Sequence, residues 1–224
     1  DNQEADRALR QALLWLMPDN NDEKYYRSYL SRHPQDGEIR NRFATAITDT
    51  LNQDAYSSFR KQNTALAKSQ FEDVLKRDPN NAQALEGLGY LYQATGDFGQ
   101  AALNLAKAAN TTSDPSKKNK LAYDAEYNSV RAMEKGGDLR GAVKKLNDLL
   151  KNAGPDHNGM LLYRASMEQR LGLHKEAEED LKTVLADDPA DVNAGEMLYY
   201  TLKNQGKTAE AKSFLDSLPS DLRR

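Results

Sequence analysis

The chain has 224 residues, of which 38% are hydrophobic, and its mean hydropathy of −0.85 is polar for one compact globule. Its 31 basic and 34 acidic residues are well mixed, which argues against a nucleic-acid-binding face or a polybasic membrane patch. The absence of cysteine excludes disulfides and cysteine catalysis, and the longest wholly apolar run, residues 12–17, is too short to span a bilayer. Leucine, tyrosine and alanine recur at helical spacing almost to the C-terminus, so we expect an elongated all-helical protein.

The N-terminal third predicts two helix pairs of unequal length. Residues 4–17 and 22–34 make the first pair, which ends near Pro34. Residues 36–52 begin the second pair, and extra residues around 57–63 precede its second helix. This second pair is about eleven residues longer than the period of the pairs that follow.

Beyond residue 63 the sequence repeats itself around an alanine in each second helix. Neighbouring anchor alanines are 34 or 35 residues apart, with one interval of 41 residues. The anchors are Ala67, Ala101, Ala142, Ala177 and Ala211. Pro79 and Pro189 predict the ends of two second helices, because proline cannot continue a helix. The periodicity predicts about six helix pairs in all.

The glycine pair Gly87 and Gly89 has two interpretations. A G-x-G phrase is typical of phosphate-binding loops, but no predicted strand precedes it, as a dinucleotide-binding fingerprint requires. We therefore expect close helix packing, in which Gly89 and Ala101 let two antiparallel helices approach each other. Gly96, between these two helices, predicts a turn with positive φ.

The one long interval falls on residues 110–120, a polar stretch with a single proline. It predicts a loop or short helical extension that acts as a hinge. The expected organisation is an N-terminal array over 1–110, a linker or hinge over 111–120, and a C-terminal array over 121–224.

Residues 82–115 carry a specific helix-pair signature. The first helix holds Leu85, Leu88, Gly89 and Tyr92, and the second holds Ala101, Leu105 and Ala108. This segment resembles the tetratricopeptide repeat (TPR) family. The resemblance implies an all-α fold, a right-handed TPR superhelix (an α-α solenoid) of about six helix pairs, with the first two units degenerate.

The resemblance also implies a concave groove, which the family lines with fixed positions of each first helix. Tyr56, Tyr90 and Tyr200 share one of these positions in three repeats. Tyrosines among amides and carboxylates suit stacking on sugar rings or gripping an extended peptide, although they also suit shielding of neighbouring helices. The Lys and Asn clamp that chaperone-binding members use for a C-terminal carboxylate is missing. The candidate groove residues are Asn52, Tyr56, Gln83, Glu86, Tyr90, Gln93, Tyr127, Arg131, Asn193, Glu196, Tyr200 and Lys203.

No pattern in the sequence predicts catalysis. His33, His157 and His174 lie far apart and outside any H-E-x-x-H arrangement, so we interpret them as surface histidines and not as metal ligands. The phrase DPADVN, residues 188–193, resembles half a calcium loop but lacks its glycine and terminal glutamate. We therefore expect a protein that is not an enzyme and has no cofactor or metal.

A second, looser resemblance concerns residues 67–109 and the early phrase with Tyr29, Leu30, Pro34 and Asp36. These segments are similar to the periplasmic TPR repeats of the bacterial cellulose synthase family, in the component that is joined to the outer-membrane pore. The resemblance implies a non-catalytic periplasmic scaffold for cellulose (exopolysaccharide) synthesis and export, which links the inner-membrane synthase to that pore. The implied partners are other subunits of a cellulose synthase complex and, as a second role, the β-1,4-glucan chain.

Two further expectations accompany this family. The chain lacks an initiating Met and a signal peptide, and its last residues, 218–224, form no polar capping helix, so we expect a fragment of a longer outer-membrane-anchored protein. We expect no nucleic-acid partner and no membrane-spanning segment within the chain itself. The alternative function is a generic TPR adaptor that binds peptide segments, in the cytosol or the periplasm.

Overall fold

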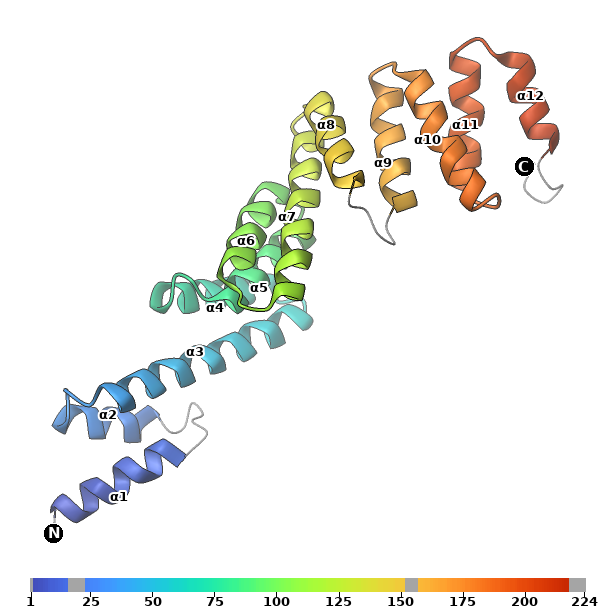
Figure 1. The fold of residues 1–224 in the computed structure, drawn as a ribbon. Coiled ribbons are helices and arrows are strands. Elements are labelled where there is room, and N and C mark those ends of the chain that lie inside the picture. The colour runs from blue at the N-terminus through green and yellow to red at the C-terminus, as the bar shows by residue number, and fades with distance from the viewer. Residues whose placement is uncertain (1, 16–22, 152–156, 218–224) are drawn as a thin grey trace. The chain divides into compact units, whose positions relative to one another are not determined.

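A computed structural model describes residues 2–15, 23–151 and 157–217, which contain twelve helices and their connecting turns (Figure 1). The chain divides into two compact units, Asp1–Ala122 and Tyr123–Arg224, which are described separately below. The helices are α1 (Asn2–Trp15), α2 (Glu23–Arg32), α3 (Gly37–Arg60), α4 (Thr64–Arg77), α5 (Ala82–Ala94), α6 (Phe98–Thr111), α7 (Pro115–Lys135), α8 (Leu139–Leu150), α9 (His157–Arg170), α10 (His174–Asp187), α11 (Val192–Asn204) and α12 (Thr208–Ser217).

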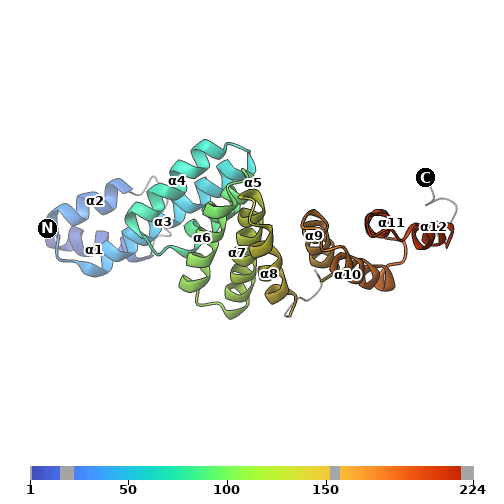
Figure 2. The same ribbon diagram turned by 90° about the horizontal axis from the view of Figure 1, so that it is seen from above.

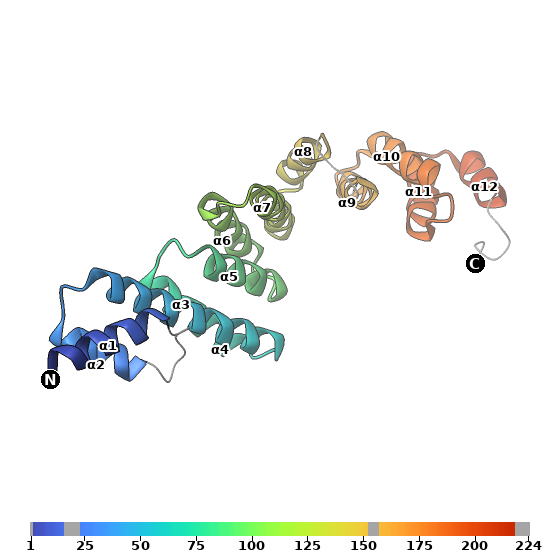
Figure 3. The same ribbon diagram turned by 60° about the horizontal axis from the view of Figure 1, so that its bottom comes forward.

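The first helix pair, α1 and α2, packs against the N-terminal part of α3 (Figure 3). Tyr26 is fully buried, and its hydroxyl donates a hydrogen bond to the Leu13 carbonyl at 2.7 Å. Asp36 caps α3 by accepting the Ile39 amide at 3.2 Å, and it also pairs with Arg10 at 2.7 Å. The hydrogen bond from Arg10 lowers the pKa of Asp36 to about 2. One carboxylate therefore both starts α3 and fastens α1 to it.

The extra residues of the second pair lengthen its first helix. α3 continues without interruption through residues 57–60, because no proline or glycine lies between Glu38 and Arg60. Only residues 61–63 remain for the turn before α4. The added turns carry Tyr56 and Arg60 on the same helix as Asn52.

The turn inside each later helix pair repeats one geometry. A residue with positive φ follows the helix, and the next amide donates to a carbonyl five residues earlier, as Asp97 does to Tyr92 at 2.9 Å. The positive-φ residues are Gly96, Gly137, Gly172 and Gly206, with φ of 75° to 85°, and Gln62, with φ of 60°. The predicted turn at Gly96 is confirmed.

Side-chain caps begin most of the helices that follow these turns. Asn63, Asp97 and Asp138 each accept an amide from the first turn of α4, α6 and α8. Leu173 holds the corresponding position before α10 and makes no side-chain cap.

The predicted proline stops are confirmed. α4 ends at Arg77 and α10 at Asp187, and each is followed by an aspartate with extended backbone that precedes the proline. The φ of Asp78 is −133° and that of Asp188 is −129°. A residue before proline avoids helical angles for steric reasons, so the proline ends the helix one residue in advance.

The glycines of α5 act in packing, as predicted. A Cβ on Gly87 would clash with the Phe71 ring of α4, and one on Gly89 would lie 2.5 Å from Leu105 Cγ of α6. The anchor alanines are also buried, at 0 to 1% exposure. α5 is therefore packed closely against the helices on both sides of it in the chain.

Unit 2 packs α9 to α12 in sequence order around one apolar cluster that includes Leu161, Leu181 and Leu198 (Figure 2). Glu178 of α10 is 6% exposed and joins this helix to the α11–α12 turn. Its carboxylate accepts from Gln205 and pairs with Lys207, both at 2.7 Å.

The long interval of the repeat mainly extends α7. α6 ends at Thr111, and α7 starts at Pro115, where Asp114 accepts the amides of Ser116 and Lys117 at 2.9 and 3.2 Å. The inserted residues are thus a short connection followed by the first turns of α7. A hinge at this place stays a prediction.

Within the ranges that the structure describes, no helix has the length and apolar character to cross a membrane. The expectation of a continuing array rests on residues 218–224, which lie outside those ranges, as does residue 218 of the last repeat copy.

Candidate functional site

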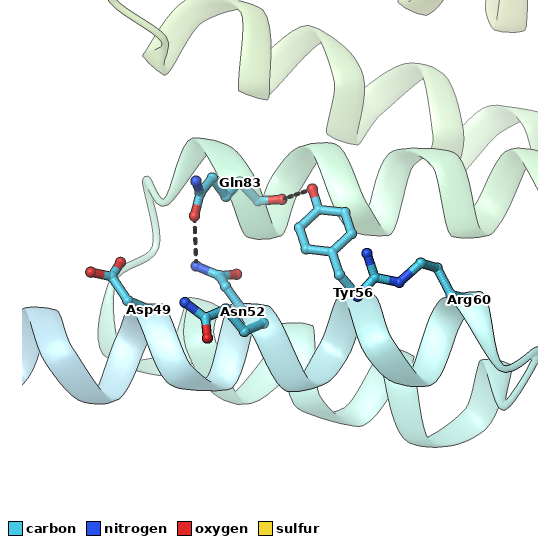
Figure 4. A pocket seen from close by; sticks show the side chains of 6 residues that line it. Asp49, Asn52, Tyr56, Arg60 and Gln83 are labelled. Atoms are coloured by element: carbon cyan, nitrogen blue, oxygen red, sulfur yellow. Dashed lines mark hydrogen bonds between the residues drawn. The ribbon is translucent and has the colours of Figure 1, made fainter. Parts of the chain in front are cut away.

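Unit 1 contains a polar cavity of about 560 Å³ between α3 and α5. Its α3 residues are spaced by three or four along the helix, so they share one face. The lining residues are Asp49, Asn52, Gln53, Tyr56 and Arg60 of α3 and Gln83 of α5 (Figure 4). Three of the predicted groove residues, Asn52, Tyr56 and Gln83, therefore come together in one place.

Asn52 forms the floor of the cavity and is 3% exposed. Its Nδ2 donates to Asn81 Oδ1 at 3.1 Å and to Gln83 Oε1 at 3.4 Å. Its Oδ1 is buried and accepts no hydrogen bond from the described residues. A buried amide oxygen without a donor is costly, and this atom is itself shielded from solvent.

Tyr56 is the aromatic wall of the cavity. Its hydroxyl donates to the Gln83 carbonyl at 2.9 Å, and its ring meets the Phe71 ring edge-on at 5.0 Å between centroids. Burial, followed by the nearby Glu86 carboxylate, raises the pKa of the Tyr56 phenol. The phenol therefore stays protonated, and the two contacts fix the ring in place.

Asp49 and Arg60 lie at opposite ends of the α3 face (Figure 4). They are eleven residues apart on one helix, which corresponds to about 16 Å. Both side chains are exposed, and neither forms an ion pair within the described part of the chain. The cavity thus offers an amide floor, one aromatic ring and a charge of each sign at its two ends.

Two further predicted residues on α5 contact side chains of α7. Lys117 pairs with Glu86 at 2.6 Å, and Lys120 donates to the Tyr90 hydroxyl at 2.8 Å with its ammonium 5.1 Å from the ring centroid. Gln93, one turn further on, is half-buried and has a polar or ring contact of its own. At Tyr90 the structure therefore matches the alternative in which the tyrosine contacts a neighbouring helix.

In unit 2, Tyr127 belongs to a cluster of three tyrosines. Its ring centroid is 6.5 Å from that of Tyr123 and 5.8 Å from that of Tyr163. The Tyr163 hydroxyl donates to Glu134 at 2.5 Å. Burial raises the pKa of the Tyr163 phenol, and the charge of Arg131, which is half-buried on α7, offsets part of this increase.

The four predicted residues of α11 form an exposed stripe. Asn193, Glu196 and Lys203 are exposed, and Tyr200 is 52% exposed. Lys203 lies over the Tyr199 ring at 5.4 Å, and the Tyr199 and Tyr200 rings meet edge-on at 5.3 Å. This stripe is open to a partner but forms no cavity of its own.

Sequence reasoning missed several residues around the cavity. Gln53 and Arg60 would have followed from treating α3 as one long helix, and Asp49 from continuing the spacing of Asn52 and Tyr56 one turn back within residues 36–52. No local signal pairs the two α7 lysines with α5.

The described residues contain no group of three or more His, Cys, Asp and Glu side chains that would suit a metal ion. The three histidines are partly exposed, and the His33 Nε2 lies 3.0 Å from Asp6 Oδ2 while its ring stacks on Tyr29 at 4.5 Å between centroids. The apolar ring surface of histidine favours such a partly covered position.

The family model for the tetratricopeptide repeat matches residues 54–116 and 127–192, more than half of the chain. The chain belongs to the tetratricopeptide repeat family. The predicted all-α TPR solenoid is confirmed, and the fold of this family is generally a non-catalytic scaffold that binds other proteins.

Two bacterial proteins are similar to nearly the whole chain. The chain is 25% identical to cellulose synthase operon protein C of Pseudomonas fluorescens (strain SBW25), over 96% of this chain and 18% of that protein. It is 23% identical to cellulose synthase 1 operon protein C of Komagataeibacter xylinus, over 94% of this chain and 17% of that protein. The chain thus spans less than a fifth of the length of these relatives. The predicted resemblance is confirmed as a similarity at this level of identity.

Solved structures support the same fold. The MamA protein is 19% identical with a TM-score of 0.60, covering 76% of this chain and 88% of its own. YrrB, a TPR protein, is 16% identical with a TM-score of 0.57, covering 85% of this chain and 89% of its own. At such identities the likeness concerns the fold alone.

Proposed function

We propose that this chain is a non-catalytic, periplasmic TPR scaffold for bacterial cellulose synthesis and export. The observation that carries the proposal is the similarity of nearly the whole chain to cellulose synthase operon protein C from two bacteria. In this role the solenoid links the inner-membrane synthase to the outer-membrane pore. The segment 111–120 then serves as a hinge between its two arrays.

Binding of other synthase subunits is the first activity of the scaffold. The cavity of unit 1 supports it, since its amide floor and its two separated charges fit an extended polypeptide with polar side chains. The exposed α11 stripe adds a second surface for protein contact.

Site-specific photocrosslinking in cellulose-producing cells tests this activity. Benzoyl-phenylalanine replaces Gln53, an exposed cavity residue, and in a control replaces Leu66, which is 47% exposed on α4 and outside the cavity. We expect crosslinks from position 53, and not from position 66, to proteins encoded with the synthase. Crosslinks of equal strength from both positions, or only to unrelated proteins, contradict the proposal.

Direct contact with the glucan is a second candidate, favoured by the Tyr56 ring beside the amide side chains that line the cavity. Sugar rings stack on aromatic faces, and their hydroxyl groups donate to amide oxygens. Titration with cello-oligosaccharides of several lengths, followed by backbone amide NMR shifts, tests it. We expect length-dependent shifts in α3 and α5 that are lost in Tyr56→Ala and kept in Tyr25→Ala, whose ring is exposed on α2. An absence of shifts at millimolar ligand removes glucan contact and leaves the protein-binding role untouched.

A further inference from the structure

A second cavity, of about 280 Å³, lies in unit 2 between α8 and the α9–α10 turn. Its α8 residues are one helical face, and it uses a second helix of the repeat, so it is separate from the first-helix positions considered above. The lining residues are Arg140, Val143, Lys144 and Asn147 of α8, with Leu171 and Leu173 of the turn. This site is called the α8 groove below.

The corresponding place at the next junction is closed by ionic contacts. The positions held here by Val143, Leu171 and Leu173 are held there by Glu178, Gln205 and Lys207. The Glu178 carboxylate binds both partners at 2.7 Å, and Lys182 also pairs with it at 2.5 Å. The α8 groove replaces this closed polar cluster with three apolar side chains that leave a cavity between them.

Leu173, like Lys207 before α12, holds a capping position of the repeat with a side chain that cannot accept a hydrogen bond. It stands where Asp97 and Asp138 cap the helices α6 and α8, it makes no cap, and it is 38% exposed. An exposed leucine at a capping position sacrifices local stability without filling a core. Such a conflict between local rule and observed residue is typical of a functional surface.

The rim of the α8 groove is cationic. Arg140 and Lys144 are exposed, one turn apart, and neither is in an ion pair with another described residue. Asp148, on the same helix, pairs with Lys151 at 2.6 Å, while Lys144 adds to the lowering of its pKa. The Asn147 amide oxygen is already held by Arg164 Nη1 at 2.7 Å. The unsatisfied features are therefore an apolar floor and two positive charges beside it.

We propose that the α8 groove docks a segment of a partner protein that presents one large apolar side chain flanked by carboxylates. The apolar side chain covers the exposed part of Leu173, and the carboxylates pair with Arg140 and Lys144 at the rim. Charge complementarity selects an acidic segment over a neutral one and makes the binding weaker at high salt.

A phage-displayed random peptide library, selected on the intact chain, supplies the probe. We expect enrichment of peptides with a leucine or aromatic residue between Asp or Glu residues. A synthetic peptide of that sequence should bind roughly tenfold more weakly to Leu173→Asp and to the double variant Arg140→Glu with Lys144→Glu. Leu66→Asp, which places the same charge on another exposed leucine, on α4 and outside the α8 groove, should bind normally.

Three results overturn the proposal. The first is a library that yields no acidic and apolar consensus, and the second is a selected peptide that binds Leu173→Asp as well as it binds the unchanged chain. The third is concentration-dependent dimerisation in sedimentation that Leu173→Asp abolishes, which would identify a second copy of the chain as the occupant. Circular dichroism of each variant separates loss of binding from loss of fold.

Discussion

Glu168 and Glu178 are both buried in unit 2, but their pKa values lie on opposite sides of the usual glutamate value. Burial, and then the neighbouring Asp180 carboxylate, raises the pKa of Glu168 to about 7, and Arg164 offsets only part of this. Burial acts in the same direction on Glu178, but hydrogen bonds from two lysines and a glutamine outweigh it and lower the pKa to about 2. One glutamate therefore favours folding when protonated and the other when ionised.

The Glu168→Gln variant tests the first of these. Because its pKa is raised on folding, Glu168 contributes stability that is complete below about pH 4.3 and is lost as the pH rises through about 7. We expect Glu168→Gln to flatten the loss of stability over this window and to raise the free energy of unfolding at pH 8 by up to about 3 kcal/mol. Urea unfolding at pH 5, 7 and 8 measures it.

The control for that experiment is Glu196→Gln, which changes an exposed glutamate of α11 that does not contribute to the pKa of Glu168. It should leave the pH dependence as it is. An unchanged pH dependence in Glu168→Gln would show that the Glu168 carboxyl ionises alike in the folded and unfolded chain.

At the scale of elements, α10 is a helix that lacks a side-chain cap at its N-terminus. In Leu173→Asp, the new carboxylate can accept an amide from the first turn of α10 and interacts favourably with the helix N-terminus. We expect the free energy of unfolding to increase by about 1 kcal/mol, with a higher thermal midpoint. Leu173→Ala supplies no acceptor and should bring no gain. Equal midpoints for the two variants would contradict the capping argument.

The turns show which structural features the sequence predicts and which it does not. Gly96 was predictable because a left-handed residue must follow the helix there, and glycine adopts that conformation at little cost. Gln62 adopts the same left-handed conformation, with φ of 60°, although it is not a glycine. The sequence of the α3–α4 turn therefore contains no glycine that marks the turn. For that reason the sequence left α3 short, and Arg60 was not connected with Asn52.

At the scale of the whole molecule, the stability of a repeat array is a sum of local terms between neighbours. Gly87→Ala forces a Cβ into the Phe71 ring, and we expect a net destabilisation of roughly 1–2 kcal/mol after the gain in helix propensity. Hydrogen exchange should become faster in α4 to α6 and stay unchanged in α9 to α12. Gly99→Ala, whose Cβ would come no closer than 3.9 Å to Asp97, is the matched control. Equal acceleration along the chain would show that the two units respond as one.

The helix pairs and the family followed from the periodicity of the anchor alanines, which are all buried. The candidate site followed only in part. The same groove position holds a tyrosine that lines a cavity at Tyr56, one covered by Lys120 at Tyr90, and one that is open at Tyr200. Which of these occurs depends on the neighbouring helix, and a repeat consensus contains no information about that neighbour.

The Glu178 cluster disfavours packing of a helix pair against the wrong neighbour. Successive helix pairs of a solenoid resemble one another, so during folding, or between two crowded chains, α10 can compete for the place of α8. Glu178 would then face Leu171 and Leu173 in place of Gln205 and Lys207, and of its three partners only Lys182, on α10 itself, would remain. A buried carboxylate that loses most of its hydrogen bonds is costly, so the exchange of one junction for another is penalised by the chemistry of a single side chain.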